Sequence, residues 1–150
     1  MNIIKFKFDK KNLMEKAINI RHKVFVIGQK CPADLEYEFE EESTHFLIVV
    51  NEKAVATARH RKTNKGYKLE RFAVLKEERG KGYGDYILKE ILKDLKEYKG
   101  MIYLHAQKQV VPFYKKNGFK KEGNYSKKQI LCIIKWNLLN NEYLQKRYIW

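Results

Sequence analysis

The sequence predicts an α+β fold in which a mixed, mostly antiparallel sheet carries helices on both faces. Three observations lead to this prediction. Short apolar runs separated by turn residues indicate strands, and two segments with apolar residues every three or four positions indicate helices. A glycine-rich loop, residues 79–84, joins one strand directly to one of these helices.

Composition limits the class of protein. The chain has 150 residues, 33% of them charged and 13% aromatic, which is typical of a globular protein. We expect one domain over residues 1–150, with residues 139–150 as a C-terminal extension. The net charge of +14 favours anionic partners. Because the lysines are scattered rather than grouped, we expect no nucleic-acid partner.

Cysteine usage and hydropathy favour the cytoplasm. Cys31 and Cys132 are far apart, without a Cys-x-x-Cys pair or a histidine cluster, which argues against a disulfide framework and a metal site. The N-terminus alternates like a strand rather than forming an apolar leader, and no apolar run is long enough to span a membrane. We therefore expect a cytoplasmic protein with no metal and no membrane partner.

The first half of the chain begins with a strand and a helix. Residues 2–8 alternate between apolar and polar, which predicts a strand. Apolar residues then recur at helical spacing from Leu13 to Ile27, which predicts a helix with Asp9 as its N-cap and Gly28 at its end.

An acidic stretch, residues 34–42, follows with six acids and no base. Two interpretations stay open: a solvated helix, or a rim that attracts a cationic amine.

Three antiparallel strands are expected at residues 45–50, 54–61 and 67–74. Asn51-Glu52-Lys53 forms a tight turn between the first two, and Thr63-Asn64-Lys65-Gly66 a hairpin turn before the third. Beyond the glycine loop, an apolar stripe predicts a helix that Gly100 stops: Ile87, Leu88, Ile91, Leu92 and Leu95. A strand over 101–106, a short helix over 110–117 and a last strand over 130–136 complete the expected elements.

The glycine loop has the composition of a pyrophosphate cradle. Gly80, Gly82 and Gly84 can take backbone angles closed to other residues and let a ligand approach the main chain. The amides at the head of the next helix point into such a loop, with the positive end of the helix dipole behind them.

With Phe72-Ala73-Val74 before it, this loop resembles the acetyl-coenzyme A loop of the GNAT superfamily of N-acetyltransferases, whose pattern is Arg/Gln-x-x-Gly-x-Gly/Ala. The resemblance implies the GNAT acyl-CoA N-acyltransferase fold and acetyl transfer from acetyl-CoA to a primary amine, with coenzyme A as product. It implies these cofactor-binding residues: Phe72, Ala73, Val74, Arg79, Gly80, Lys81, Gly82, Tyr83, Gly84, Phe113 and Tyr114.

The segment Phe113-Tyr114-Lys115-Lys116-Asn117-Gly118-Phe119 resembles the GNAT helix that meets the sulfur end of the coenzyme. The resemblance implies that Tyr114 protonates the departing thiolate; a tyrosine buried for packing is the alternative. For the base, Glu70 and His105 are both candidates. A water relay, a surface role for Glu70 and a core role for His105 also stay open.

Arg21-His22-Lys23-Val24-Phe25-Val26, with Thr44-His45-Phe46-Leu47, resembles a bacterial-type GNAT group with the signature Arg-x-x-Val-Phe-Val-x-Glu-Gln. The chain departs from it at Gly28, where the group has glutamate. The expected substrate-binding residues are Arg21, Arg71 and His45.

The acceptor has more than one candidate. Glu70 and the tyrosine helix also resemble the aminosugar-phosphate N-acetyltransferases, and Arg21, Arg59, Arg71, Lys127 and Lys128 are candidates for a phosphate pocket. The hypothesis is therefore an aminosugar phosphate such as glucosamine 6-phosphate. One alternative acceptor is a polyamine or lysine peptide, which the acidic stretch would suit. The other alternative is a non-catalytic acyl-CoA-binding module. The aromatic C-terminal tail also leads us to expect a homodimer.

Overall fold

The computed structural model describes residues 1–28, 38–125 and 128–133, and divides the chain into two compact units. The first unit comprises Met1–Arg61 and Arg71–Leu92, and the second Lys62–Glu70 and Lys93–Trp150. The expected extension at 139–150, on which the expected homodimer rests, lies outside the described residues, as do Lys127 and residues 34–37 of the acidic stretch.

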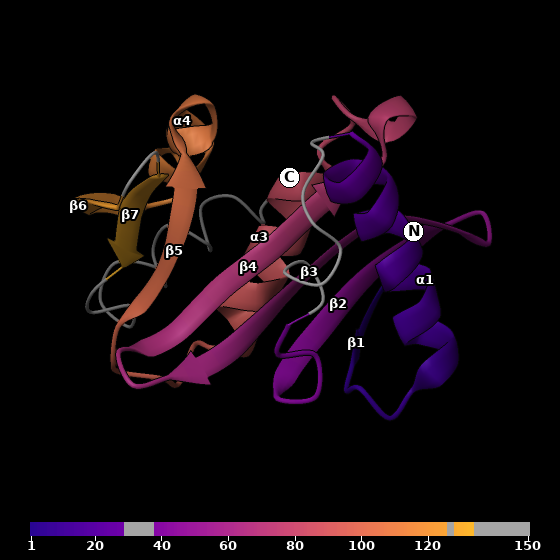
Figure 1. Cartoon of the computed structure of the whole chain (residues 1–150), viewed down its shortest axis with the longest axis horizontal. Helices are drawn as coiled ribbons and strands as arrows, with labels where there is room; N and C mark the ends of the chain where they lie inside the picture. Colours follow the sequence, from indigo (N-terminus) through magenta and orange to yellow (C-terminus); the bar gives the residue numbers. More distant parts are fainter. Residues whose placement is uncertain (29–37, 126–127, 134–150) are drawn as a thin grey trace. The chain divides into compact units, whose positions relative to one another are not determined.

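Antiparallel strands form the frame of the first unit (Figure 1). They are β1 (Asn2–Phe6), β2 (Ser43–Val50) and β3 (Lys53–Thr63). β1 pairs with β2, and β2 with β3, each in antiparallel register. Asn51 and Glu52 have positive φ angles of 49° and 66°, the backbone of the two-residue turn that matches strand twist. The predicted hairpin is confirmed, while the first strand ends two residues before its predicted end.

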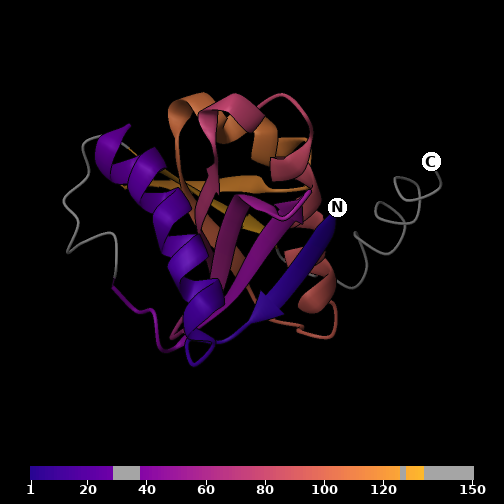
Figure 2. The same cartoon turned by 90° about the vertical axis from the view of Figure 1, so that its right-hand side faces the viewer.

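Helices lie on opposite faces of these strands, α1 (Lys11–Arg21) on one and α3 (Tyr83–Asp94) on the other (Figures 1 and 2). A π-helical turn, η1 (His22–Ile27), continues α1, and a short 3₁₀ turn, η2 (Lys76–Glu78), precedes the glycine loop. The predicted helix over 13–27 is therefore an α-helix followed by a wider turn.

The predicted N-cap at Asp9 is wrong. Lys10 occupies the cap position without a side-chain hydrogen bond. The carbonyl of Asp9 accepts a bond from the Lys11 amide at 3.1 Å instead. A backbone turn, and no carboxylate of the cap residue, thus satisfies the first amide of the helix.

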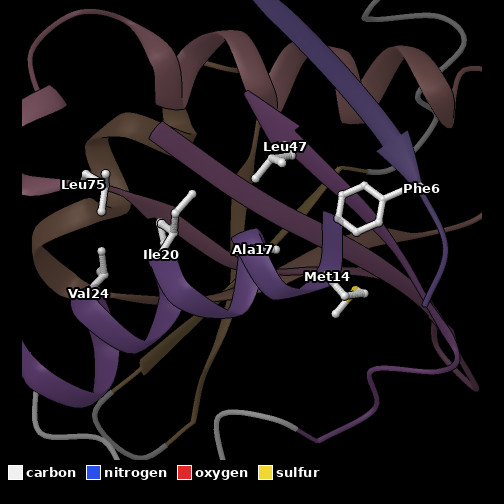
Figure 3. Close-up of a cluster of buried hydrophobic side chains, with 8 residues drawn as sticks. Phe6, Met14, Ala17, Ile20, Val24, Leu47 and Leu75 are labelled. Atoms are coloured by element: carbon white, nitrogen blue, oxygen red, sulfur yellow. The ribbon is translucent and has the colours of Figure 1, made fainter. Parts of the chain in front are cut away.

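The core between α1 and the sheet contains apolar side chains from the helix, from two strands and from the end of a third (Figure 3). It consists of Phe6, Met14, Ala17, Ile20, Val24, Leu47, Ala73 and Leu75. Because side chains alternate along a strand, the buried neighbours of Leu47 point to the opposite face, where α3 lies. There α3 presents the buried stripe that its sequence predicts.

The second unit contains the parallel pairing. Its strands follow the order β4 (Gly66–Val74, of which residues 66–70 belong to this unit), β5 (Ile102–Gln107), β7 (Lys128–Ile133) and β6 (Lys120–Tyr125). β4 and β5 pair in parallel, whereas β7 is antiparallel to both of its neighbours. The prediction of a mixed, mostly antiparallel sheet is confirmed.

Two short helical turns connect β5 to β6: η3 (Lys108–Val110) and α4 (Val111–Lys115). β6 was not predicted, because Lys120-Lys121-Glu122-Gly123-Asn124-Tyr125 lacks apolar alternation. Charged residues are common in strands at the end of a strand order, where they discourage pairing with other chains. β7 begins at Lys128, two residues before the predicted start.

Candidate functional site

The glycine loop leads directly into α3 and keeps an open space above it. Gly80 and Gly82 have φ angles of 80° and 85°, which side chains rarely adopt. A Cβ added to either would meet no atom within 4 Å. Nε of Arg79 donates to the carbonyl of Val74 at 3.2 Å and so ties the loop to the end of β4.

The N-terminus of α3 faces this loop with backbone donors. The first turn closes when the Tyr86 amide bonds the Gly82 carbonyl at 3.0 Å. The earlier amides of the helix have no carbonyl one turn before them, which is the general condition at a helix start. Left-handed glycines with open space and a helix N-terminus fit a pyrophosphate group.

β4 contains a backbone irregularity that the sequence did not predict. Arg71 has a φ of 59° in the middle of the strand. Strict alternation from Leu69 would put Leu69, Arg71 and Ala73 on one face. A left-handed residue interrupts that alternation, as in a β-bulge. Ala73 and Leu75 then pack in the α1 core, while Phe72 and Val74 are half-buried.

Glu70 immediately precedes this irregularity and belongs to the second unit. Its carboxylate is 6% exposed and lies 3.3 Å from Nζ of Lys68, which is 18% exposed. His105, the other candidate base, is half-buried on β5, where its ring lies 6.0 Å from that of Tyr103. Both candidate bases therefore lie on neighbouring strands of the same unit.

Tyr114 lies in α4, also in the second unit. Pro112 is in the first turn of this helix, and Gly118, with a φ of 95°, follows it. The Tyr114 ring is buried and makes edge-on contacts with Phe113 at 5.0 Å and Phe119 at 5.8 Å. Burial raises the pKa of Tyr114 well above that of an exposed phenol. The phenol is therefore protonated at neutral pH.

Two of the three predicted substrate residues are buried in the first unit around Glu40. Arg21 donates two hydrogen bonds to the Glu40 carboxylate, at 2.5 and 3.1 Å, and Arg59 donates one at 2.5 Å. Nε2 of His45 lies 3.0 Å from the Glu40 carbonyl oxygen. We call these four residues the Glu40 cluster. Sequence reasoning placed Glu40 in the acidic stretch and missed its buried role, because the surrounding acids give it no distinguishing signal.

This cluster favours the neutral form of His45. Burial lowers its pKa most, the nearby Glu40 opposes that shift, and the charges of Arg21 and Arg59 add to it. Its ring also stacks on Phe6, with centroids 5.5 Å apart.

The structure groups the predicted residues by unit. The first unit brings together Arg79–Gly84 with the end of β4, and Arg21 with His45. The second unit contains Glu70, His105, Phe113 and Tyr114. Among the residues that the structure describes, no three histidines, cysteines or carboxylates gather as metal ligands. Nor does any helix within them have the length and apolarity to cross a membrane.

Comparison with known proteins assigns the family. Residues 11–139 match the model of the acetyltransferase (GNAT) domain. The chain belongs to the GNAT acetyltransferase family. It is 41% identical over 110 residues to the uncharacterized N-acetyltransferase YjcF of Bacillus subtilis, covering 71% of this chain and 78% of that one.

Solved structures share the fold. The crystal structure of Escherichia coli ElaA has a TM-score of 0.78 at 21% identity and covers 88% of this chain and 98% of its own. An aminoglycoside 6′-N-acetyltransferase complexed with coenzyme A has a TM-score of 0.69 at 16% identity, covering 88% and 94%. The chain is therefore an acetyl-CoA-dependent N-acetyltransferase with the GNAT fold.

Proposed function

We propose that this enzyme acetylates the primary amine of a small molecule, and that its first-choice acceptor is an aminosugar phosphate such as glucosamine 6-phosphate. One observation carries the acetyl-CoA part of the proposal: two left-handed glycines with open space above them stand before a helix of 12 residues. We further propose that residues 1–150 act as one cytoplasmic domain, since two distant cysteines suit a reducing compartment.

The coenzyme-binding roles follow from the loop. The amides of Lys81 to Gly84 hold the pyrophosphate, and Arg79, fixed to Val74, braces the loop. The main chain at Ala73 and Val74 holds the pantetheine and polarises the thioester carbonyl. When bound, acetyl-CoA supplies the acetyl group: the amine nitrogen bonds its carbonyl carbon and the carbon–sulfur bond breaks.

Two proton transfers remain for side chains. Tyr114 Oη donates a proton to the sulfur, and the phenol carries that proton at neutral pH. Glu70 or His105, directly or through water, takes a proton from the amine. The ion pair with Lys68 favours Glu70, because a carboxylate is the form that accepts a proton.

The phosphate of the acceptor would bind arginine. Arg21 and Arg59 are 1% and 0% exposed, whereas Arg71 is less deeply buried, so Arg71 is the favoured phosphate ligand among the described arginines considered for it. Arg71 is half-buried and has an unusual backbone, a combination that is common where a side chain is aimed at a ligand.

A second class of acceptor, a polyamine or lysine peptide, has its own support. Of the acidic stretch, the structure describes Glu38 to Glu42. Glu38, Glu41 and Glu42 are exposed, whereas Glu40 is buried. Exposed carboxylates on one turn attract cationic amines.

The test is thiol release from acetyl-CoA across glucosamine 6-phosphate, glucosamine, spermidine and a lysine peptide. We expect activity on glucosamine 6-phosphate. In Arg71→Met the KM for glucosamine 6-phosphate should rise by at least about tenfold, since charge-assisted hydrogen bonds contribute about 1.5–3 kcal/mol. Activity on spermidine or the peptide alone would overturn the phosphosugar. Coenzyme binding with no turnover on any amine would favour an acyl-CoA-binding module.

A further inference from the structure

A lysine on the strand of Glu70 reaches its carboxylate. Lys68 and Glu70 are two residues apart on β4, so their side chains lie on the same face of the strand. Nζ of Lys68 lies 3.3 Å from Oε2 of Glu70, and the carboxylate is 6% exposed. A carboxylate so buried depends on nearby cations or donors to remain charged.

The same face continues onto the neighbouring strand. Lys68 and Tyr103 are partners in the parallel register of β4 and β5, so both point to one side of the sheet. His105, two residues beyond Tyr103, points the same way. The Tyr103 hydroxyl hydrogen-bonds Oγ1 of Thr63 at 2.7 Å. One face of these strands thus has a row of polar groups that includes both candidate bases.

We infer that Lys68 is a positioning residue: its ammonium keeps Glu70 as an oriented carboxylate on this polar face. The inference rests on the proposed function, in which Glu70 is a candidate base. A carboxylate can take the proton that an alkylammonium acceptor must lose before its nitrogen attacks, and a carboxylic acid cannot. Lys68 therefore acts through Glu70 and needs no contact with the acceptor.

The effect of Lys68 must be distinguished from the effects of other charged groups on β3 and β5. On β5, His105 lies on the same face. On β3, the other arm of the hairpin, Arg59 and Arg61 occupy alternate positions; Arg59 binds Glu40, and Arg61 lies 3.9 Å over the ring of Phe39. These groups are unchanged in variants of Lys68. A comparison of Lys68→Met with Lys68→Arg therefore isolates the charge at position 68.

The first measurement is a ¹³C NMR titration of the Glu70 side-chain carboxyl, assigned by the signal that Glu70→Gln removes. We expect the midpoint to rise by about one pH unit in Lys68→Met and to stay near the wild-type value in Lys68→Arg. A midpoint unchanged in Lys68→Met, or raised equally in both variants, would overturn the inference.

The second measurement is the pH dependence of kcat/KM with the amine found in the panel. In Lys68→Met the acid limb of the profile should move to higher pH by as much as the NMR midpoint does, and kcat should fall while the KM for acetyl-CoA stays unchanged. In Lys68→Arg the acid limb and kcat should both stay near their wild-type values. Lys65→Met, an exposed lysine of the hairpin turn, is the matched control.

The two measurements separate the two proposals. Silence of the wild-type enzyme on every amine, with the NMR midpoint shifted as expected, would leave the Lys68–Glu70 inference supported and overturn the proposed acceptors. An active enzyme whose acid limb does not move in Lys68→Met would overturn the inference alone.

Discussion

At the scale of single residues, the clearest feature is charge in the interior of the first unit. Arg21 is 1% exposed, Arg59 0% and Glu40 8%. Removing charges from water costs several kcal/mol each, and the bonds between Glu40 and the two arginines offset part of that cost. The guanidinium groups bind the carboxylate from a helix and a strand, so Glu40 fastens the turn before β2 to both elements.

Replacing Glu40 by glutamine should therefore destabilise the protein strongly. Two buried guanidinium groups would lose the negative charge of Glu40, and breaking a buried pair costs about 3–5 kcal/mol. Urea unfolding measures the change. Glu38→Gln, at an exposed position of the same turn, should stay within about 0.5 kcal/mol of the wild type. Equal stability of the two variants would contradict the buried network.

His45 predicts a pH dependence of stability. Its folded pKa lies below the ordinary 6.5, so below that pH the unfolded chain binds a proton that the folded protein does not. Stability should fall as pH drops from 6.5 toward the lowered folded pKa and should be independent of His45 above 6.5. Urea unfolding at pH 8, 6 and 5 measures this. His45→Phe should reduce the slope, whereas His22→Gln, at an exposed position, should retain it.

Tyr114 predicts a separation of rate from affinity. Tyr114→Phe removes the proton donor while keeping the ring between Phe113 and Phe119. We expect kcat to fall by about 10²-fold or more, with KM for acetyl-CoA within a factor of about two. Steady-state thiol release measures both, with Tyr98→Phe as control. A Tyr114→Phe enzyme with wild-type kcat would remove Tyr114 from the chemistry.

At the scale of elements, the loop between β4 and α3 and the π-helical turn η1 both depend on glycine. Gly28 closes the π-helical turn, and a Cβ there would lie 2.6 Å from the Val24 carbonyl oxygen. Glutamate, which the related GNAT group has at this position, would require the turn to move. The departure at Gly28 thus has a local backbone cause.

The loop before α3 yields a sharper test. Gly82→Ala adds a methyl group at a φ of 85° into the open space above the loop. We expect a loss of about 1 kcal/mol in stability and a rise of at least about tenfold in the Kd for coenzyme A, as titration calorimetry would show. Lys93→Ala, at an exposed position in the last turn of α3, is the control and should bind normally. Unaltered affinity in Gly82→Ala would exclude the loop from coenzyme binding.

At the scale of the whole molecule, a ligand that binds only the folded protein should stabilise it by mass action. Coenzyme A at about 100 times its Kd should contribute about 2.7 kcal/mol, a rise in Tm of about 5–10 °C for a chain of this size. Differential scanning calorimetry with and without coenzyme A measures the shift, and Gly82→Ala should reduce it. Adenosine, which lacks the pyrophosphate, should produce no comparable rise. An equal rise with adenosine would contradict the pyrophosphate cradle.

The sequence by itself determined the family, the cofactor and most elements. These depend on local signals: apolar spacing on α3, turn residues at Thr63–Gly66, and glycines at 80 and 82, which have the positive φ angles that a cradle requires. Such signals lie within a few neighbouring residues, so one sequence is enough to detect them. β6 escaped prediction because its partner, not its own composition, makes it a strand.

Only the tertiary structure decided which charged side chains are buried and form ion pairs inside the protein. Arg21 and Glu40 are 19 residues apart, as are Glu40 and Arg59, and no local pattern links them. The left-handed backbone at position 71 likewise could not be predicted, because the residue there is an arginine and not a glycine or asparagine. The physical reason is the same in both cases. Ion pairs and strand irregularities are set by what the fold brings alongside a residue, and that information lies elsewhere in the chain.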